Sequence, residues 1–288
     1  MFICKVENSL GEQIVLTQNE SQFQVFQIDG LNPTNAQINT TPLASIDGAK
    51  FNSSKLETKQ LVIYIKLNGE VEENRLKLYS FFPTKEWCRF FYKNGLRDVF
   101  IDGYVQTVEV TPFTNEEIMQ VAILCPQSYF KGVDEIITDI SKTVSLFKFP
   151  FSIDEAVPVP ISEYRDNRVT VITNRSESRS GLYIDVSVLG SIKKILIRNT
   201  VTGEQIVIIN PDGFIYGDTI KIDTYQGEKS VILVRNGIKT NLFSKLQSGF
   251  TFLQLERGDN RFSYQIDNGA NDHLVNIQFR YHPLYRGV

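Results

Sequence analysis

Short runs in which apolar and polar residues alternate recur along most of this 288-residue chain. The run QLVIYIKLNG at residues 60–69 is followed by similar runs at 88–93, 104–110 and 118–125. Alternation with a period of two places successive side chains on opposite faces of a strand, so one face is buried and the other meets water. The pattern therefore predicts a mainly β protein with antiparallel sheets.

One stretch in the first half has a helical spacing instead. In EVEENRLKLYSFFP, residues 70–83, the apolar residues Val71, Leu78 and Phe82 recur three to four positions apart or in multiples of that spacing. Glutamates at the start favour the positive end of a helix dipole, and Pro83 ends the helical pattern. We expect a single helix of about three turns among the strands.

The segment before that helix is polar and poor in core residues. Two Ile-Asp-Gly turn signals, at Asp29-Gly30 and at Asp47-Gly48, frame Thr- and Asn-rich stretches. A two-stranded arm of this composition is not stable by itself and is expected to lie against another surface. Asp29, Gly30, Asp47 and Gly48 therefore mark a candidate interface arm.

The composition changes between residues 147 and 166, where three prolines interrupt any strand pairing and favour an extended connector. Beyond this point roughly nine short strand-like runs are separated by turn signals, as an antiparallel sandwich requires. The predicted organisation is a first domain at 1–130, a Pro-containing linker at 131–163 and a second domain at 164–288.

Charge and hydropathy exclude two classes of partner. The formal net charge is −3, without the clustered cations that a duplex-binding surface needs, so sequence-specific nucleic-acid binding is not expected. No apolar run approaches the roughly 18 residues of a membrane helix, so membrane insertion is not expected either. The first residues lack the pattern of a secretion signal.

The residues that usually hold metals are few and scattered. Cys4, Cys88 and Cys125 lie far apart and form no metal-binding pair, and the two histidines, His273 and His282, lie near the C-terminus. The cysteines are interpreted as reduced and buried. We expect no metal site and no cofactor.

Asp98 and Asp102 are the candidate pair of catalytic carboxylates in residues 92–110. On one strand they lie about 13 Å apart, beyond the roughly 5–9.5 Å of paired glycosidase carboxylates. Ion pairing or a turn role explains them better, and Asn94-Gly95 predicts a tight hairpin just before them. No catalytic residues are expected.

Aromatic residues beside turns of the second half are candidates for sugar contact. The rings of Phe214, Tyr216 and Tyr225 are flat surfaces that stack on sugars. The alternative is that these side chains close the end of the predicted sandwich and are partly buried. The sequence leaves both readings open.

The order of segments along the chain resembles the distal tail protein family of long, flexible-tailed bacteriophages and prophages. In the first half the matching segments are FQIDGL, ASIDGAKFNSSKLETKQLVIYIKLNG, VEENRLKLYSFFPTK, CRFFYKNGLRDVFIDGYVQTVEVTPFTN and QVAILCPQSYF. In the second half they are NTVTGEQIVIIN, GDTIKIDTYQGEKSVILVRNGIKTNLF and FLQLERGDNRFSYQID. The resemblance covers the chain from about Gln22 to Ile266, and the last stretch, residues 267–288, is not matched.

This resemblance implies a structural hub rather than an enzyme. Members form a homohexameric ring at the virion tail tip, assembled in the host bacterial cytoplasm. The ring joins the tail tube protein to the tail-associated lysin or tip protein and to the receptor-binding apparatus. The N-terminal domain is a β-sandwich with one helix and a belt hairpin that embraces the neighbouring protomer. The C-terminal domain is a galectin-like sandwich akin to carbohydrate-binding modules.

Two alternatives stay open at the level of sequence. One is a carbohydrate-binding module that contacts host cell-wall glycan through the second domain. The other is a glycoside hydrolase with an accessory domain, whose two carboxylates would come from separate strands.

Overall fold

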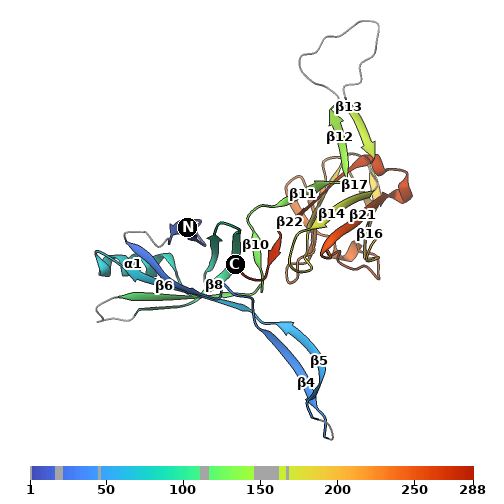
Figure 1. Cartoon of the computed structure of the whole chain (residues 1–288). Coiled ribbons are helices and arrows are strands. Elements are labelled where there is room, and N and C mark those ends of the chain that lie inside the picture. The colour runs from blue at the N-terminus through green and yellow to red at the C-terminus, as the bar shows by residue number, and fades with distance from the viewer. Residues whose placement is uncertain (1, 17–21, 45–46, 111–116, 146–161, 167–168) are drawn as a thin grey trace. The chain divides into compact units, whose positions relative to one another are not determined.

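The computed structural model describes residues 2–16, 22–44, 47–110, 117–145, 162–166 and 169–288. The chain divides into two compact units (Figure 1). The first contains residues 1–134 together with 284–288, and the second contains residues 135–283. The described part of the chain is mainly β, as the alternating pattern predicted.

A nine-stranded antiparallel sheet forms the body of the first unit. Seven strands follow one another in the order β2 (Gln13–Val15), β1 (Ile3–Asn8), β7 (Trp87–Lys93), β8 (Asp98–Val110), β9 (Ile118–Cys125), β6 (Lys59–Leu67) and β3 (Phe23–Asp29). The short strands β10 (Phe130–Gly132) and β23 (Leu284–Tyr285) pair with each other, and β10 also pairs with β8. Strand β8 joins two halves of the sheet, because residues 98–104 pair with β7 and residues 104–110 pair with β9.

Both halves of this sheet bury their inward side chains in one core. In β6 the residues Leu61, Ile63, Ile65 and Leu67 are all buried, which confirms the period-two pattern. The predicted helix is also confirmed, as α1 (Val71–Phe81), and Leu78 packs into the same core. Each such side chain contributes roughly 1.5–3 kcal/mol when it is fully buried.

Asp98 and Asp102 act as ion-pair partners within the sheet. Asp102 accepts two hydrogen bonds from Arg89, at 2.6 and 3.1 Å, and Asp98 lies 2.6 Å from Lys93 Nζ. In each pair the two residues stand directly opposite on β7 and β8. The carboxylates therefore neutralise neighbouring cations. Ion pairing was one interpretation of Asp98, whereas Asp102 was interpreted as a turn or bulge residue and lies inside β8.

The tight hairpin predicted at Asn94-Gly95 is wrong in its turn type. Residues 94–97 form a four-residue loop, and Gly95 is absent from the described residues with positive φ. The side-chain oxygen of Asn94 accepts hydrogen bonds from the N–H groups of Leu96 and Arg97, at 2.9 and 2.8 Å. This side-chain cap stabilises the longer loop.

The second unit is a sandwich of two antiparallel sheets around one core. The six-stranded sheet has the order β11 (Ile136–Asp139), β22 (Val275–Tyr281), β15 (Tyr183–Val188), β18 (Thr219–Asp223), β19 (Ser230–Arg235) and β20 (Ile238–Asn241). The four-stranded sheet has the order β14 (Val169–Asn174), β21 (Gly258–Ile266), β16 (Ile192–Asn199) and β17 (Gln205–Phe214). Across the core, the ring of Phe262 lies 4.9 Å from the ring of Phe279.

Smaller elements complete the second unit. Strands β12 (Ser141–Ser145) and β13 (Ser162–Asp166) pair as a separate hairpin. Among the described residues of this unit, short 3₁₀ helices are η1 (Phe243–Lys245), η2 (Asp267–Gly269) and η3 (Asp272–Leu274).

The units differ from the predicted domains at the C-terminus and within the expected linker, where residues 131–132 already belong to β10 of the first unit and residues 141–145 form β12 of the second. Residues 136–139, expected in the linker, form strand β11 of the second unit. The last five residues, expected in the second domain, belong to the first unit, because Leu284 and Tyr285 pair with β10. Residues 146–161, which hold the prolines of the expected linker, lie outside the described residues.

Candidate assembly interface on the first unit

A long two-stranded hairpin, hereafter the arm, interrupts the first unit between β3 and β6. Its strands are β4 (Ala36–Pro42) and β5 (Ala49–Leu56), which pair with each other in a sheet of their own (Figure 1). Every residue of both strands is exposed. The arm thus has no core of its own, and an isolated hairpin is marginally stable at best.

The pairing of β4 with β5 gives the arm two chemically different faces. Residues directly opposite each other in a ladder point to the same side. The apolar face consists of the pairs Ala36–Leu56, Ile38–Ser54, Thr40–Phe51 and Pro42–Ala49. The polar face consists of the pairs Gln37–Lys55, Asn39–Ser53 and Thr41–Lys50, together with Asn52.

A β-bulge in the arm is needed for this separation. The register shifts by one residue between Asn39 and Thr40, so β5 has an extra residue at this point. Without the shift, Phe51 would point to the polar face. Side-chain hydrogen bonds from Asn39 to Ser53, at 3.0 Å, and from Asn52 to Thr41, at 2.7 Å, hold the bulge on the polar side.

The apolar face is left in water in the isolated chain. Ile38 and Phe51 are 61% and 60% exposed, and Leu56 is 39% exposed. Burying side chains of this size against a partner contributes roughly 1.5–3 kcal/mol each. Aligned exposed apolar residues on a hairpin without a core are typical of a protein–protein contact.

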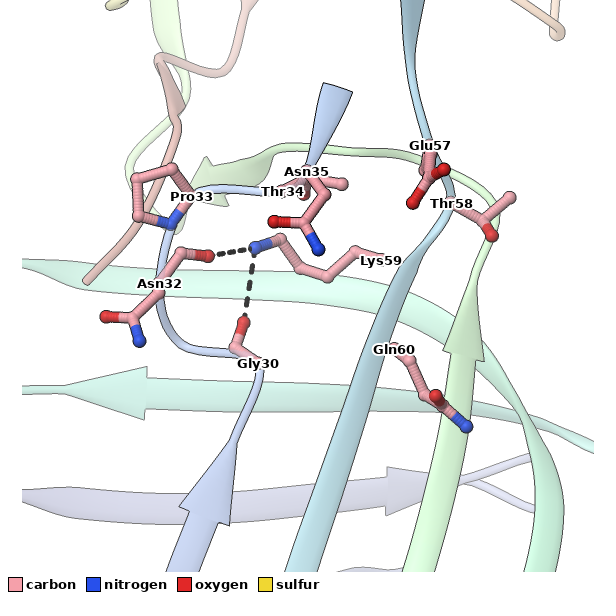
Figure 2. A pocket seen from close by; sticks show the side chains of 9 residues that line it. All are labelled: Gly30, Asn32, Pro33, Thr34, Asn35, Glu57, Thr58, Lys59 and Gln60. Carbon is pink, nitrogen blue, oxygen red and sulfur yellow. Dashed lines mark hydrogen bonds between the residues drawn. The ribbon is translucent and has the colours of Figure 1, made fainter. Parts of the chain in front are cut away.

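Lys59 fixes the root of the arm from inside the unit. Its side chain is 3% exposed, and its ammonium group donates to the carbonyl oxygens of Asn32, at 2.6 Å, and of Gly30, at 3.2 Å (Figure 2). The same nitrogen lies 4.8 Å from the centre of the Phe130 ring. Burial lowers the pKa of Lys59, and the two carbonyls and the ring take the place of water around the cation.

Further hydrogen bonds hold the two chain segments at the root together. Glu57 N–H donates to the carbonyl of Asn35 at 3.0 Å, and the Ser128 hydroxyl donates to the carbonyl of Glu57 at 2.7 Å. The backbone N–H of the last residue, Val288, donates to the carbonyl of Leu31 at 3.0 Å. Between these segments lies a polar pocket of about 340 Å³, lined in part by Lys59 (Figure 2).

The four residues that the sequence assigned to the arm lie at its two opposite ends. Asp29 and Gly30 are at the root, where Gly30 has φ +91° and a Cβ would lie 2.1 Å from the Gln60 carbonyl oxygen. Asp47 and Gly48 precede β5 at the tip, and a Cβ on Gly48 would meet nothing within 4 Å. The predicted limits of the arm ended at Gly48. In the structure the arm continues beyond Gly48 to Leu56.

Sequence reasoning missed the buried cation and the two-faced arm. Lys59 is in phase with the buried residues Leu61 and Ile63, and this parity was a usable signal for an inward side chain. In the arm, even-numbered residues of β4 such as Ile38 pair with even-numbered residues of β5 such as Ser54. Phe51 has an odd number, so the alternation of side chains along the strands does not by itself place it on the same face as Ile38. The bulge that aligns them carries no sequence signal such as glycine.

Two of the three sugar-contact candidates are buried. Phe214 is 0% exposed and Tyr225 is 5% exposed, so neither ring face can stack on a sugar, and this prediction is wrong for both. The Tyr225 hydroxyl accepts a hydrogen bond from His282 N–H at 3.1 Å, and burial raises the pKa of Tyr225 to about 12. Both rings close the sandwich, whereas Tyr216 is 77% exposed.

The three cysteines are buried in the core of the first unit. Burial raises the pKa of Cys88 and of Cys125 to about 12, so their thiolates do not form near neutral pH. Within the described residues, no group of three His, Cys, Asp or Glu side chains is arranged to hold a metal ion. No helix among them has the length and apolar composition of a membrane span.

No family model and no curated protein sequence matches the chain. The crystal structure of the SPP1 Dit protein (gp 19.1), described as a paradigm of hub adsorption apparatus in phages that infect Gram-positive bacteria, has a TM-score of 0.68 and 11% identity. That alignment covers 99% of both chains.

Two further similar structures are chains of the phage P2 baseplate in its activated conformation, with Ca and with Sr. They have TM-scores of 0.56 and 0.54 and 13% identity, and each alignment covers 100% of both chains. At such low identity a likeness of this kind establishes the fold. From one end to the other, the chain has the fold of the phage distal tail (Dit) proteins.

Proposed function

We propose that this protein is the distal tail hub of a long-tailed phage or of a related prophage particle. As a homohexameric ring at the end of the tail tube, it would join the tube to the tip protein and to the receptor-binding apparatus. The observation that carries the proposal is the likeness to a Dit protein over 99% of both chains, because both units are present in the same order.

The arm supplies the contact that such a ring requires. Its apolar face exposes Ile38, Phe51 and Leu56 to water. Its root is held by the hydrogen bonds of Lys59 and by backbone hydrogen bonds. An arm that its root holds in one position loses less conformational entropy than a mobile arm when its apolar face binds a neighbouring copy. In the ring, each copy embraces the next with its arm.

The role is structural rather than catalytic. The sandwich of the second unit is proposed to be the galectin-like domain of the family and to face outward. Asp98 and Asp102, the carboxylates that the sequence singled out, are paired with cations of the sheet. The protein would assemble in the host cytoplasm, where buried reduced cysteines are ordinary.

Immunogold labelling of purified tails tests the location. An antibody raised against the second unit should label the distal end of each tail in negative-stain images. Label spread along the tube, or confined to the head-proximal end, would contradict the hub role. Label competition with the purified chain is the control for antibody specificity.

A further inference from the structure

The chain returns to the first unit after the last strand of the second unit. Residues 284–288, which we call the return segment, belong to the first unit. Only His282 and Pro283 separate this segment from β22, whose inward side chains lie in the core of the second unit. The return segment is therefore a direct covalent extension of a core strand of the second unit.

Contacts within the first unit hold the return segment in place. Leu284 and Tyr285 pair with β10, and Leu284 is buried. Arg97 donates a hydrogen bond to the carbonyl of Gly287, and its guanidinium lies 4.7 Å from the centre of the Tyr285 ring. Because β23 has only two residues, the strength of binding depends on the local concentration at which the chain presents the return segment.

The far end of the return segment binds the root of the arm. The N–H of Val288 donates to the carbonyl oxygen of Leu31 at 3.0 Å. A Cβ on Gly287 would lie 3.0 Å from the same oxygen and 3.0 Å from Pro33 Cδ, so the two backbones approach closely. Lys59 binds carbonyls in the same stretch of the root. The return segment and Lys59 therefore fix the same part of the arm root.

The second unit brings the points where the chain enters and leaves it together. Ile136 stands opposite Tyr281 in the pairing of β11 with β22. Beside this pair, Arg280 donates to Glu135 at 3.1 Å. Strand β10 ends at Gly132, shortly before Glu135. The folded second unit therefore closes a short loop between β10 and the return segment.

We infer that folding of the second unit controls the root of the arm through the return segment. When the second unit unfolds, the contacts of the return segment must close a loop of about 150 residues instead of about 10. The dependence of closure entropy on loop length then lowers the local concentration of the segment roughly 50-fold. The segment detaches, and the root loses the contacts at Leu31 and Pro33. In the proposed hub, only a chain with a folded second unit presents a fixed arm, and this consequence alone rests on the proposed function.

A disulfide that keeps the loop short separates this coupling from a merely structural role. Asp139 and Gln278 stand directly opposite on β11 and β22, and Gln278 Nε2 donates to Asp139 Oδ1 at 3.0 Å. Opposite positions in an antiparallel ladder have Cα distances that a disulfide spans. The double variant Asp139→Cys with Gln278→Cys therefore keeps the loop short even when the second unit unfolds. The native cysteines are buried in the first unit.

Hydrogen exchange on the intact chain, measured by mass spectrometry, tests the coupling. Phe262 is fully buried, so Phe262→Ala lowers the melting temperature of the second unit. The temperature is chosen so that β16 and β21 have lost protection in this variant while β7 and β8 keep theirs. The readouts are the return segment and the N–H of Glu57, which donates to the carbonyl of Asn35 across the root. Phe262→Leu, a milder change, gives the same comparison at a higher temperature if Phe262→Ala does not fold.

We expect both readouts to exchange roughly tenfold faster in Phe262→Ala than in the wild type. The oxidised disulfide should restore the wild-type rates in the Phe262→Ala background, and its reduction by dithiothreitol should abolish this rescue. An unchanged rate at the root, or a faster rate that the disulfide does not restore, would overturn the inference. Neither readout requires a ring, so a failure here leaves the hub role intact, and a chain that forms no ring leaves this coupling intact.

Discussion

The ammonium nitrogen of Lys59, a residue that is only 3% exposed, lies 2.6 Å from the backbone carbonyl oxygen of Asn32. A buried cation is costly unless its hydrogen bonds replace water, and here two carbonyls and an aromatic ring do so. The contact joins β6, the strand that follows the arm in the chain, to the segment from which the arm starts. The orientation of the arm at its root therefore depends on the side chain of Lys59.

Lys59→Met should loosen the root of the arm and lower stability. The carbonyls of Gly30 and Asn32 lose the donor that the buried Lys59 side chain supplies, which costs about 1–3 kcal/mol. Chemical denaturation measures the loss, and limited proteolysis should cut residues 30–35 faster in the variant. Lys55→Met, an exposed change on the arm, serves as the control and should stay within about 0.5 kcal/mol of wild type.

Gly30→Ala should be far more harmful than Gly48→Ala, although both glycines have a positive φ. A Cβ on Gly30 would lie 2.1 Å from the Gln60 carbonyl oxygen, whereas a Cβ on Gly48 meets open space. We expect Gly48→Ala to cost about 1–2 kcal/mol from its backbone alone and Gly30→Ala to cost more than that. Equal melting temperatures of the two variants would show that the root accepts a side chain.

Asp218→Asn should destabilise the second unit in a pH-dependent way. Burial opposes ionisation of Asp218, but hydrogen bonds from Arg235 and from the Ile215 N–H outweigh it and lower the pKa of this carboxyl. A lowered folded-state pKa gives stability that is present above the ordinary value near 3.8 and is lost as the pH falls through the folded-state pKa.

At pH 7 the loss in Asp218→Asn should be about 2 kcal/mol, below the 3–5 of a fully buried pair because Arg235 is partly exposed. As the pH falls from 3.8 through the lower folded-state pKa of Asp218, the stabilities of the variant and the wild type should converge in unfolding experiments. Asp212→Asn is the control, since that carboxylate is 86% exposed and lies 3.6 Å from Lys245. A pH-independent difference for Asp218→Asn would contradict the ion-pair account.

Removing the arm should abolish assembly without unfolding the body. The N–H of Glu57 already meets the carbonyl of Asn35 at 3.0 Å, so a short Gly-Ser turn can replace residues 36–56. Because the described residues of this segment, 36–44 and 47–56, are all exposed, we expect the melting temperature to change little. If this variant still forms rings, the arm is not needed for assembly.

The sequence predicted the elements well where local pattern decides structure. In β6, Leu61 and Ile63 alternate with outward residues, and in α1 the spacing of Val71 and Leu78 is helical; both elements formed as expected. These patterns depend on neighbours along the chain, and the sandwich of the second unit follows from the same local signals.

The features that the sequence did not predict depend on contacts between distant segments. Phe214 and Tyr225 stand beside turns, and only the packing of the two sheets decides that their rings point inward. Leu284 pairs with Lys131 across more than half of the chain, which no local signal indicates. The apolar face of the arm depends on a bulge whose position is set by side-chain hydrogen bonds of Asn39 and Asn52.

The solution mass of the purified chain, measured by light scattering together with negative-stain imaging, tests the central claim most directly. The account predicts a particle of about six times the 32.9 kDa chain, with six-fold symmetry and a central channel, and a monomer when residues 36–56 are replaced. A wild-type chain that stays monomeric at high concentration and also in the presence of its tail tube protein would contradict it.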